Sequence, residues 1–280
     1  MIIDAHHHLW HYTPEEFDWI SPDMAAIRRD FLPADLDETI SSAGVDATIA
    51  VQARQSLEET RWLLDTAAKS RFIRAVVGWA PLTNPHLQSI LEPLAANPRL
   101  RALRHVIQGE PDGFMLRDDF NHGISALALL HLRYDLLIFA RQLPEAIQFV
   151  DRHPKQIFIL DHIAKPDVRN HTLDPWRSHI TDLARRPNVY CKISGMVTEA
   201  DWQNWTPESL HPYANVVLEA FTPRRLMFGS DWPVSLVASS YNQWLNVLGT
   251  WIKPLSPEEQ RRILGETAAE AYGLTLKGPQ

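Results

Sequence analysis

The chain has 280 residues, of which 45% are hydrophobic and 22% charged, so it can form a large core and disorder is not expected. The 27 basic and 34 acidic residues give a net charge of −7, which argues against a general nucleic-acid binder because phosphate backbones need a basic surface. The single cysteine, Cys191, excludes an intramolecular disulfide, and we expect it to be buried and catalytically idle. No signal-peptide pattern and no apolar run of about 20 residues is present, which predicts a cytoplasmic protein without a membrane span.

Eight short apolar runs recur along the chain, and segments with helical character separate them. Each run is rich in Val, Ile, Leu or Phe, as is typical of strands that are buried on both faces of a parallel sheet. In chain order the runs are Ile2–Ala5, Ala47–Ala53, Ile73–Trp79, Leu100–His105, Asp135–Ala140, Ile157–Asp161, Val189–Ile193 and Leu226–Gly229.

The segments between these runs favour helices. Ser56–Ser70 and Pro144–His153 repeat apolar residues at a helical period, and Ser256–Glu259 forms a capping box with proline at the first helical position. Eightfold alternation of strand and helix predicts an α/β protein, a (β/α)8 TIM barrel that spans residues 1–280 as a single domain. The long, aromatic segment Leu9–Leu32 breaks this rhythm, and we expect it to be an active-site loop over the barrel mouth.

Polar and ionisable side chains follow the predicted strands, at the end of the barrel where active sites of this fold lie. Two histidines, His6 and His8, are two residues apart on the first strand, so both point to the same side, which we take to be the barrel interior. Together they could hold one metal ion or bind a carbonyl oxygen, although such a pair can also be part of a core. His7 should point away from the interior.

Two further residues complete the candidate catalytic centre. Asp231 follows the last apolar run and could accept a proton from an attacking water or ligate a metal, but it could also cap the helix after Pro233. His162 follows the sixth run, where it could join the same centre or hydrogen-bond a nearby carbonyl. We further expect substrate contacts from two sets of side chains. The polar and charged set is Gln52, Arg104, His105 and Lys192, and the aromatic set is Trp10, Trp79 and Trp232. Arg104 could equally form a structural ion pair, and each tryptophan could serve packing alone.

Five motifs in order along the chain resemble the amidohydrolase-2 family, and within it the sugar-lactonase branch that contains L-fuconolactonases and L-rhamnonolactonases. They are IDAHHHLW (3–10), LRH (103–105), LDHIAKP (160–166), KISG (192–195) and MFGSDWP (227–233). The segment ILGETA (263–268) also resembles the closing helix of that family. Five ordered motifs are more specific than a pair of histidines alone.

The resemblance implies hydrolysis of a ring ester at a centre of His6, His8, His162 and Asp231. It implies one divalent metal, with zinc first in line, because three imidazoles and a carboxylate suit that ion. The branch also contains metal-independent lactonases, so the presence of the ion stays open. A two-metal site is disfavoured, because strand 4 ends in Arg104-His105 and lacks the bridging lysine or glutamate of binuclear relatives.

We therefore expect a lactonase that opens a neutral sugar lactone, such as L-fucono- or L-rhamnonolactone, with water activated by Asp231. Three alternatives stay open: a lactonase for pyrone dicarboxylates, a metal-dependent decarboxylase of the same superfamily, and a binding barrel without activity. A dicarboxylate pocket would need several convergent cations, of which only Arg104 is identified. A small-molecule partner is expected, and the chain could form a homo-oligomer.

Overall fold

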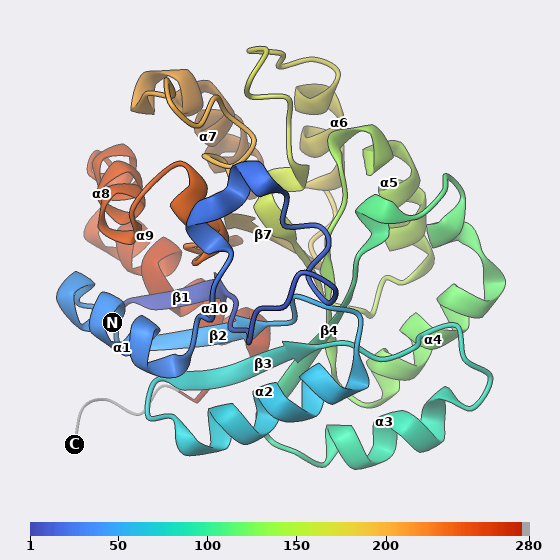
Figure 1. The fold of residues 1–280 in the computed structure, drawn as a ribbon. Helices are drawn as coiled ribbons and strands as arrows, with labels where there is room; N and C mark the ends of the chain where they lie inside the picture. The colour runs from blue at the N-terminus through green and yellow to red at the C-terminus, as the bar shows by residue number, and fades with distance from the viewer. Residues whose placement is uncertain (276–280) are drawn as a thin grey trace.

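A computed structural model describes residues 1–275 and shows eight parallel strands that form one sheet curled into a barrel (Figure 1). The strands follow one another in chain order around the sheet. They are β1 (Ile3–His7), β2 (Ala47–Val51), β3 (Ile73–Gly78), β4 (Leu100–His105), β5 (Arg133–Leu136), β6 (Phe158–Leu160), β7 (Val189–Ile193) and β8 (Leu226–Phe228). The predicted (β/α)8 barrel is confirmed.

One strand lies away from its predicted position. β5 shares only Asp135 and Leu136 with the expected run Asp135–Ala140. Leu137 and Ile138 are buried, but the chain there has left the sheet, and it then enters the short helix η4 (Ala140–Gln142). Buried residues outside a sheet give the same apolar pattern as buried residues within it. The position predicted for this strand from the apolar pattern was therefore wrong.

Helices surround the barrel, and they lie on its outer side (Figure 1). They are α1 (Pro33–Ala43), α2 (Leu57–Lys69), α3 (Leu87–Ala95), α4 (Asp118–Leu129), α5 (Leu143–Arg152), α6 (Trp176–Leu183), α7 (Pro207–Phe221), α8 (Tyr241–Ile252), α9 (Pro257–Arg261) and α10 (Thr267–Tyr272). The helices expected around residues 56–70 and 144–153 are confirmed as α2 and α5. The Ser256 capping box also forms at the start of α9, and a π-helical turn, η7 (Arg262–Glu266), leads from it into α10.

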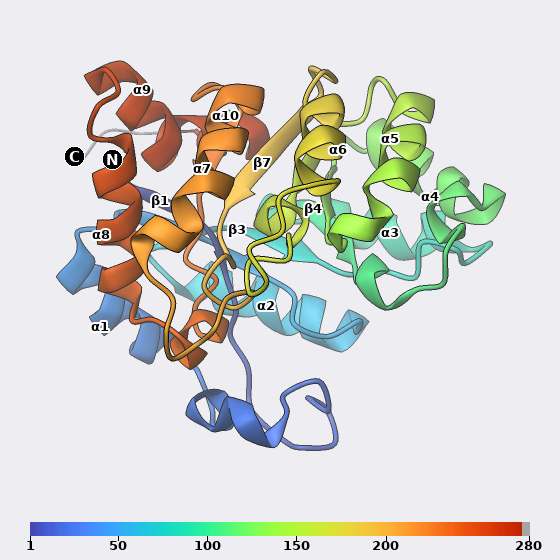
Figure 2. The same cartoon turned by 90° about the horizontal axis from the view of Figure 1, so that it is seen from above.

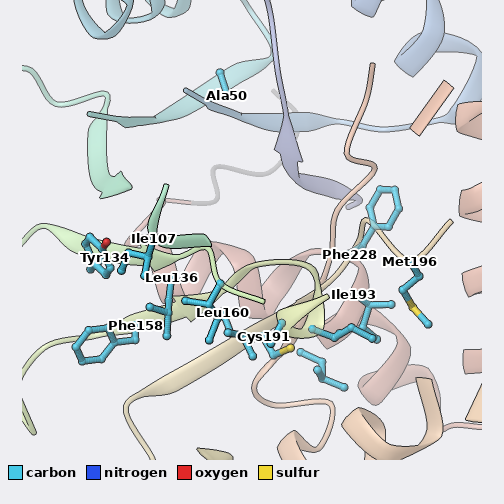
Figure 3. Close-up of a cluster of buried hydrophobic side chains, with 14 of the residues drawn as sticks. Ala50, Ile107, Tyr134, Leu136, Phe158, Leu160, Cys191, Ile193, Met196 and Phe228 are labelled. Carbon is cyan, nitrogen blue, oxygen red and sulfur yellow. The ribbon is translucent and has the colours of Figure 1, made fainter. Parts of the chain in front are cut away.

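The main core lies between the sheet and the helices. Figure 3 shows side chains from the outer face of neighbouring strands in this layer, among them Leu136, Leu160, Cys191 and Ile193. Cys191 is fully buried, as expected, and burial raises the pKa of its thiol. A buried thiol of this kind is held in the inert, protonated form.

A smaller apolar cluster occupies the inside of the barrel and is continued by α10. It includes Ile3, Ala5, Ile49 and Val51, together with Tyr272 from α10. Because β1 already points Ile3 and Ala5 inward, regular alternation would turn His6 and His8 outward. A β-bulge prevents this.

The bulge lies in β1 beside β2. Asp4 pairs with Thr48 and His7 pairs with Ala50, so three residue steps of β1 match two steps of β2. The extra residue shifts the alternation, as bulges do. As a result His6 and His8 point into the barrel, and His7 points away from it, with its Nε2 2.9 Å from the Thr48 hydroxyl.

The ends of β1 and β8 are joined, which closes the barrel at its mouth. The His8 amide donates to the carbonyl of Trp232 at 2.7 Å, and the Asp231 amide donates to the carbonyl of His6 at 2.8 Å. The segment after β1 then crosses the mouth, with Trp10 and Phe31 paired through both of their backbone amides. Figure 2 shows this segment, in dark blue, projecting beyond one end of the barrel. In residues 1–275 no helix combines the length and the apolar character needed to cross a membrane.

Candidate active site

Three side chains from the two ends of the chain converge at the mouth of the barrel. The Nε2 atoms of His6 and His8 are 3.2 Å apart, and Oδ1 of Asp231 lies 3.7 Å and 3.5 Å from them. His162 approaches from β6, with its Nε2 3.8 Å from the same oxygen. The structure therefore brings together all four residues that the sequence analysis placed at the catalytic centre.

His162 is carried by an unusual backbone turn, η5 (Asp161–Ala164). Residues 162–165 all have positive φ, between 47° and 61°, and Asp231 has a φ of 57°. Such conformations are costly for residues other than glycine and are concentrated at functional sites. The His162 ring is fixed by a 2.9 Å contact of its Nδ1 with the hydroxyl of Ser194. Gly195 lies directly beneath the ring, because a Cβ there would be 2.5 Å from the same Nδ1.

The spacing of these donor atoms fits a small metal ion. Tetrahedral zinc with ligands at 2.0–2.2 Å separates neighbouring donor atoms by about 3.4 Å. The contacts among His6, His8 and Asp231, 3.2 to 3.7 Å, bracket that value, and these three residues form one group of possible ligands. His162 lies 3.8 Å from Asp231 but belongs to a second group of possible ligands, with His6 and Asp161. The donor set is also chemically suitable, since imidazole and carboxylate are zinc ligands. The residues therefore fit a metal site.

A buried ion pair lies behind the histidines. Arg104 donates from Nη1 to Oδ2 of Asp161 at 2.9 Å, and its other terminal nitrogen donates to the backbone carbonyl of Gln52. The Gln52 side chain returns a hydrogen bond to the Arg104 carbonyl at 3.2 Å. The second oxygen of Asp161 lies 3.3 Å from Nδ1 of His6. This network fixes the guanidinium beside the reaction centre.

Lys192 lies deeper in the barrel and is completely buried. Its Nζ is 2.5 Å from Oδ2 of Asp135, 2.9 Å from Oδ1 of Asp161 and 3.1 Å from Nδ1 of His6. Tyr272 of α10 donates to the same Asp135 oxygen at 2.6 Å. Two cations, Lys192 and Arg104, are thus matched with two aspartates, which is how buried charges are tolerated.

Burial and neighbouring charges set the protonation of the centre. Burial lowers the pKa of His162 to about 4 and the pKa of His6 well below its usual value, so both imidazoles are neutral at neutral pH. Burial raises the pKa of Asp231, but His162 and His8 outweigh it, and the net pKa is below normal. Burial likewise opposes the ionisation of Asp161, but Lys192 and the other cations hold its pKa well below its usual range. The centre therefore offers an ionised carboxylate beside two neutral imidazoles, those of His6 and His162.

A cavity of about 520 Å³ opens above this centre. His8, Arg104, His162 and Asp231 lie at its inner end. Loops supply the rest of the lining, in chain order Glu16, Asp18, Trp19, Met24, Ala53, Arg54, Gln55, Val106, Gln108, Leu137, Lys165, Thr198, Glu199, Trp202 and Val234. The volume is in the range of small-molecule sites.

A family model described as amidohydrolase matches residues 3–274 of this chain. The chain belongs to the amidohydrolase family. It is 39% identical to an L-fucono-1,5-lactonase of Burkholderia multivorans, over 97% of this chain and 96% of the relative. An L-fucono-1,5-lactonase of Burkholderia ambifaria is 34% identical over 96% and 94% of the two chains. A crystal structure of a Burkholderia multivorans amidohydrolase with bound zinc has a TM-score of 0.94 and 38% identity, and covers 98% of this chain and all of the other.

The expected substrate contacts of this amidohydrolase fall in different places. Arg104 lines the cavity. Gln52 and Lys192 are fully buried behind it and support Arg104 and His6. The indole of Trp79 donates to His105, whose other ring nitrogen contacts Glu110, and neither is among the described lining residues.

The other two tryptophans that were expected to contact substrate, Trp10 and Trp232, instead hold the segment over the mouth. Trp10 and Trp232 are nearly inaccessible, and the ring of Phe31 packs edge-on against both. Trp10 also donates through its indole to the carbonyl of Arg29 at 2.8 Å. The segment Leu9–Leu32 does lie at the cavity, as expected, because Glu16, Trp19 and Met24 line it.

Several lining residues were not identified from the sequence. Arg54, Trp202 and Glu199 lie on loops beyond the strands, whereas the prediction of site residues rested mainly on the residue at each strand end. Lys165 stands within the quoted LDHIAKP motif, where its charge was a usable signal. These residues set the polarity of the outer cavity.

The contact between Gly195 and His162 leads to a first prediction. Gly195→Ala should place a methyl group against the imidazole and displace His162, so turnover should fall while the protein still folds. Gly44→Ala is the matched control, because Gly44 also has a positive φ, +68°, but nothing lies within 4 Å of its Cβ position. Both variants should lose about 1 kcal/mol of stability from the backbone conformation.

Steady-state rates and urea unfolding of both variants test this prediction. Only Gly195→Ala should lose activity beyond its loss of stability. Equal activity in the two variants would show that the position of His162 does not matter.

Proposed function

We propose that this amidohydrolase hydrolyses a neutral sugar lactone to its aldonic acid, with lactones of the L-fucono- and L-rhamnono- type as first candidates. One observation carries the proposal: an ionised Asp231 faces neutral imidazoles at the floor of a cavity whose cations are already paired. The two relatives named as L-fucono-1,5-lactonases, matched over nearly the whole chain, support the same substrate class.

The charges of the cavity favour a neutral ligand over a dicarboxylate. Among the described lining residues, three are arginine or lysine, and each is paired with a carboxylate. Arg54 contacts Glu16 at 2.5 Å, Lys165 contacts Glu199 at 3.3 Å, and Arg104 contacts Asp161. A pyrone dicarboxylate would have to break these pairs to obtain the cationic clamps it needs.

Two tryptophans give the cavity flat apolar surfaces. Trp19 comes from the segment over the mouth, and Trp202 comes from the loop after β7. The indole nitrogen of Trp202 is already used by the carbonyl of Thr198 at 2.9 Å, so its ring face is what remains for a ligand. An apolar face combined with a few placed polar groups suits the alternating C–H and O–H surface of a sugar ring.

In the proposed reaction Asp231 is the general base. A water beside its carboxylate loses a proton to Asp231 and attacks the lactone carbonyl, and negative charge develops on the carbonyl oxygen. Arg104, whose Nη1 lies 3.5 Å from Nε2 of His6, supplies a fixed positive charge beside that oxygen. The ring C–O bond then breaks, and Asp231 returns its proton to the ring oxygen, which leaves the aldonic acid.

We propose that His6, His8, His162 and Asp231 hold one zinc ion. When bound, zinc would supply a Lewis acid for the carbonyl and lower the pKa of water. The residues below this centre disfavour a second ion, because Arg104 and Lys192 already bring two positive charges next to His6. Asp161, which could otherwise bridge two ions, is committed to both of those cations.

The substrate class can be tested by measuring acid release from a panel of aldonolactones beside a pyrone dicarboxylate. We expect kcat/KM of about 10⁴ M⁻¹s⁻¹ or more for the preferred sugar lactone, the low end for ordinary enzymes. Carbon dioxide release from aromatic acids should be absent. A pyrone that outperforms every sugar lactone, or only trace rates on all lactones, would overturn the assignment.

Asp231→Asn should lower kcat by about 10²–10⁴, the usual contribution of a general base, without unfolding the protein. Asp18→Asn is the control, because Asp18 lines the same cavity and the substitution removes the same charge. It should keep most of the activity. Asp231 is not the base if its variant retains more than about a tenth of the wild-type rate.

Protein purified without chelators should contain one zinc per chain or less, measured by elemental analysis. His6→Ala should lower the zinc content, because His6 is one of the four proposed zinc ligands. His11→Ala is the control, since His11 is a solvent-exposed histidine that pairs with Asp30. Two equivalents of zinc in the wild-type protein would contradict the single-ion site.

A further inference from the structure

A second cavity, of about 560 Å³, lies at the end of the barrel opposite the reaction centre, and we call it the lower cavity. Ile3 and Ala47, the first residues of β1 and β2, line it together with residues at the starts of β3 and β4. Its volume is in the range of small-molecule sites. Because the active sites of this fold lie at the other end of the strands, a ligand of the lower cavity would be bound without being converted.

Three arginines, Arg74, Arg99 and Arg101, line the lower cavity, although the whole chain has a net charge of −7. Asp46 is the one acidic residue among the described lining residues, and its carboxylate already accepts from the Ile2 amide at 2.7 Å. In the part of the chain that the structure describes, none of the three arginines forms an ion pair. The cations of the active-site cavity, by contrast, are each paired with a carboxylate. The lower cavity therefore carries an uncompensated positive charge.

The backbone of β3 presents Arg74 to this cavity through a shift in strand register. Ile73 pairs with Thr48 of β2. Ala75 pairs with Ile49, the next residue of β2, so Arg74 is the extra residue of β3. The side chain of Arg74 is exposed, whereas its two neighbours in the strand are fully buried. Extra residues of this kind are common at the rims of barrels, where they change the direction of a side chain.

The next strand, β4, repeats the same irregularity. Leu100 pairs with Val76 of β3, and Ala102 pairs with Val77, which leaves Arg101 as the extra residue. Arg101 is half-buried, and its Nε has no hydrogen-bond partner among the described residues. Two neighbouring strands thus each bring one arginine to the lower cavity, and we call this pair, Arg74 and Arg101, the bulge arginines.

Other arginines near this end of the barrel have an evident structural role. Arg133 donates from Nε to the carbonyl of Ala271 at 2.8 Å, and Arg225 donates to the carbonyl of Val189 at 2.9 Å. Arg99 of the lower cavity also donates to a backbone carbonyl, that of Ile73. Within the described chain the bulge arginines make no hydrogen bond of this kind through their side chains. The fold therefore positions the bulge arginines without using their donors.

The positive charges at this end of the barrel repel one another. Burial lowers the pKa of Arg99, and the charge of Arg74 lowers it further. Burial and then the charge of Arg101 lower the pKa of Arg133 in the same way. Like charges that are held near one another destabilise a compact fold, and a bound anion would relieve this repulsion.

We propose that the lower cavity binds a small anion of the phosphate class, inorganic phosphate or a phosphate monoester, through Arg74, Arg99 and Arg101. The planar guanidinium group matches the oxygens of a phosphate with two parallel hydrogen bonds, and a phosphate has enough oxygens to accept from several arginines at once. The volume also leaves room for the organic part of a monoester. The inference does not rest on the proposed lactonase activity, because the two sites share no lining residue.

The first test is calorimetric titration of the wild-type protein with inorganic phosphate and with glycerol 2-phosphate, at a constant ionic strength set with sodium chloride. We expect saturable binding of one anion per chain. Tighter binding of the ester would identify an organic phosphate as the ligand, and tighter binding of inorganic phosphate would identify the free ion. No saturable binding of either at millimolar concentration, or tighter binding of citrate than of both, would overturn the proposal.

The second test locates the bound anion with single variants. Arg74→Gln and Arg101→Gln should each weaken phosphate binding by about 10-fold or more, the usual effect of losing a hydrogen bond to a charged group. Arg54→Gln is the matched control, because it removes the same charge from the active-site cavity, and its affinity should be unchanged. Unchanged affinity in both bulge variants would show that the anion binds elsewhere.

Urea unfolding separates ligand binding from a structural role of the bulge arginines. Without phosphate the bulge variants should be as stable as the wild type, because no protein hydrogen bond is lost. With phosphate only the wild type and Arg54→Gln should gain stability, since a ligand stabilises the form that binds it. Bulge variants that are less stable without phosphate, together with a wild type that phosphate does not stabilise, would make these arginines structural. If Arg101→Gln does not fold, the exposed Arg74 decides alone.

Discussion

The reaction centre depends on the hydrogen bonds of one buried carboxylate, Asp4. Its Oδ1 accepts from the amides of His6 at 3.0 Å and Ser230 at 2.9 Å, and its Oδ2 accepts from the hydroxyls of Ser230 at 2.6 Å and Tyr241 at 3.0 Å. The first contact spans the β1 bulge, and the contacts with Ser230 fix the residue before Asp231. Burial raises the pKa of Asp4 to about 6 although these donors oppose the shift. One side chain therefore joins the two ends of the barrel and holds both halves of the centre in place.

The sequence predicted the barrel because buried parallel strands are apolar on both faces, and eight such runs alternate with helices. It also predicted that His6 and His8 face the barrel interior, but it could not predict the bulge that turns them there. Ile3 and Ala5 point inward, and only the extra residue between Asp4 and His7 turns His6 inward as well. A bulge depends on hydrogen bonds between distant segments, and it leaves no periodic signal. The left-handed turn that carries His162 could not be predicted from the sequence either. Its residues do not include a glycine, which is the usual sequence signal for positive φ.

The four residues of the centre were found because their positions after strands, and the resemblance, point to the mouth of the barrel. The substrate contacts were harder to predict, since residue type does not tell whether a side chain lies in the cavity or behind its wall. Lys192 faces the barrel interior, but one layer below His6, where it meets Asp135 from β5. Arg54 and Trp202 reach the cavity from loops, whose paths are set by packing that a strand pattern does not describe.

The deeper layer explains how the centre can keep its histidines neutral. If Lys192 and Arg104 lacked Asp135 and Asp161, their charges would lie uncompensated in a dry interior, at a cost of about 3–5 kcal/mol for each broken pair. With the aspartates present the layer is balanced, and His6 can share an ammonium proton donor without becoming charged itself. The ionised Asp231 then has two neutral imidazoles, those of His6 and His162, as neighbours.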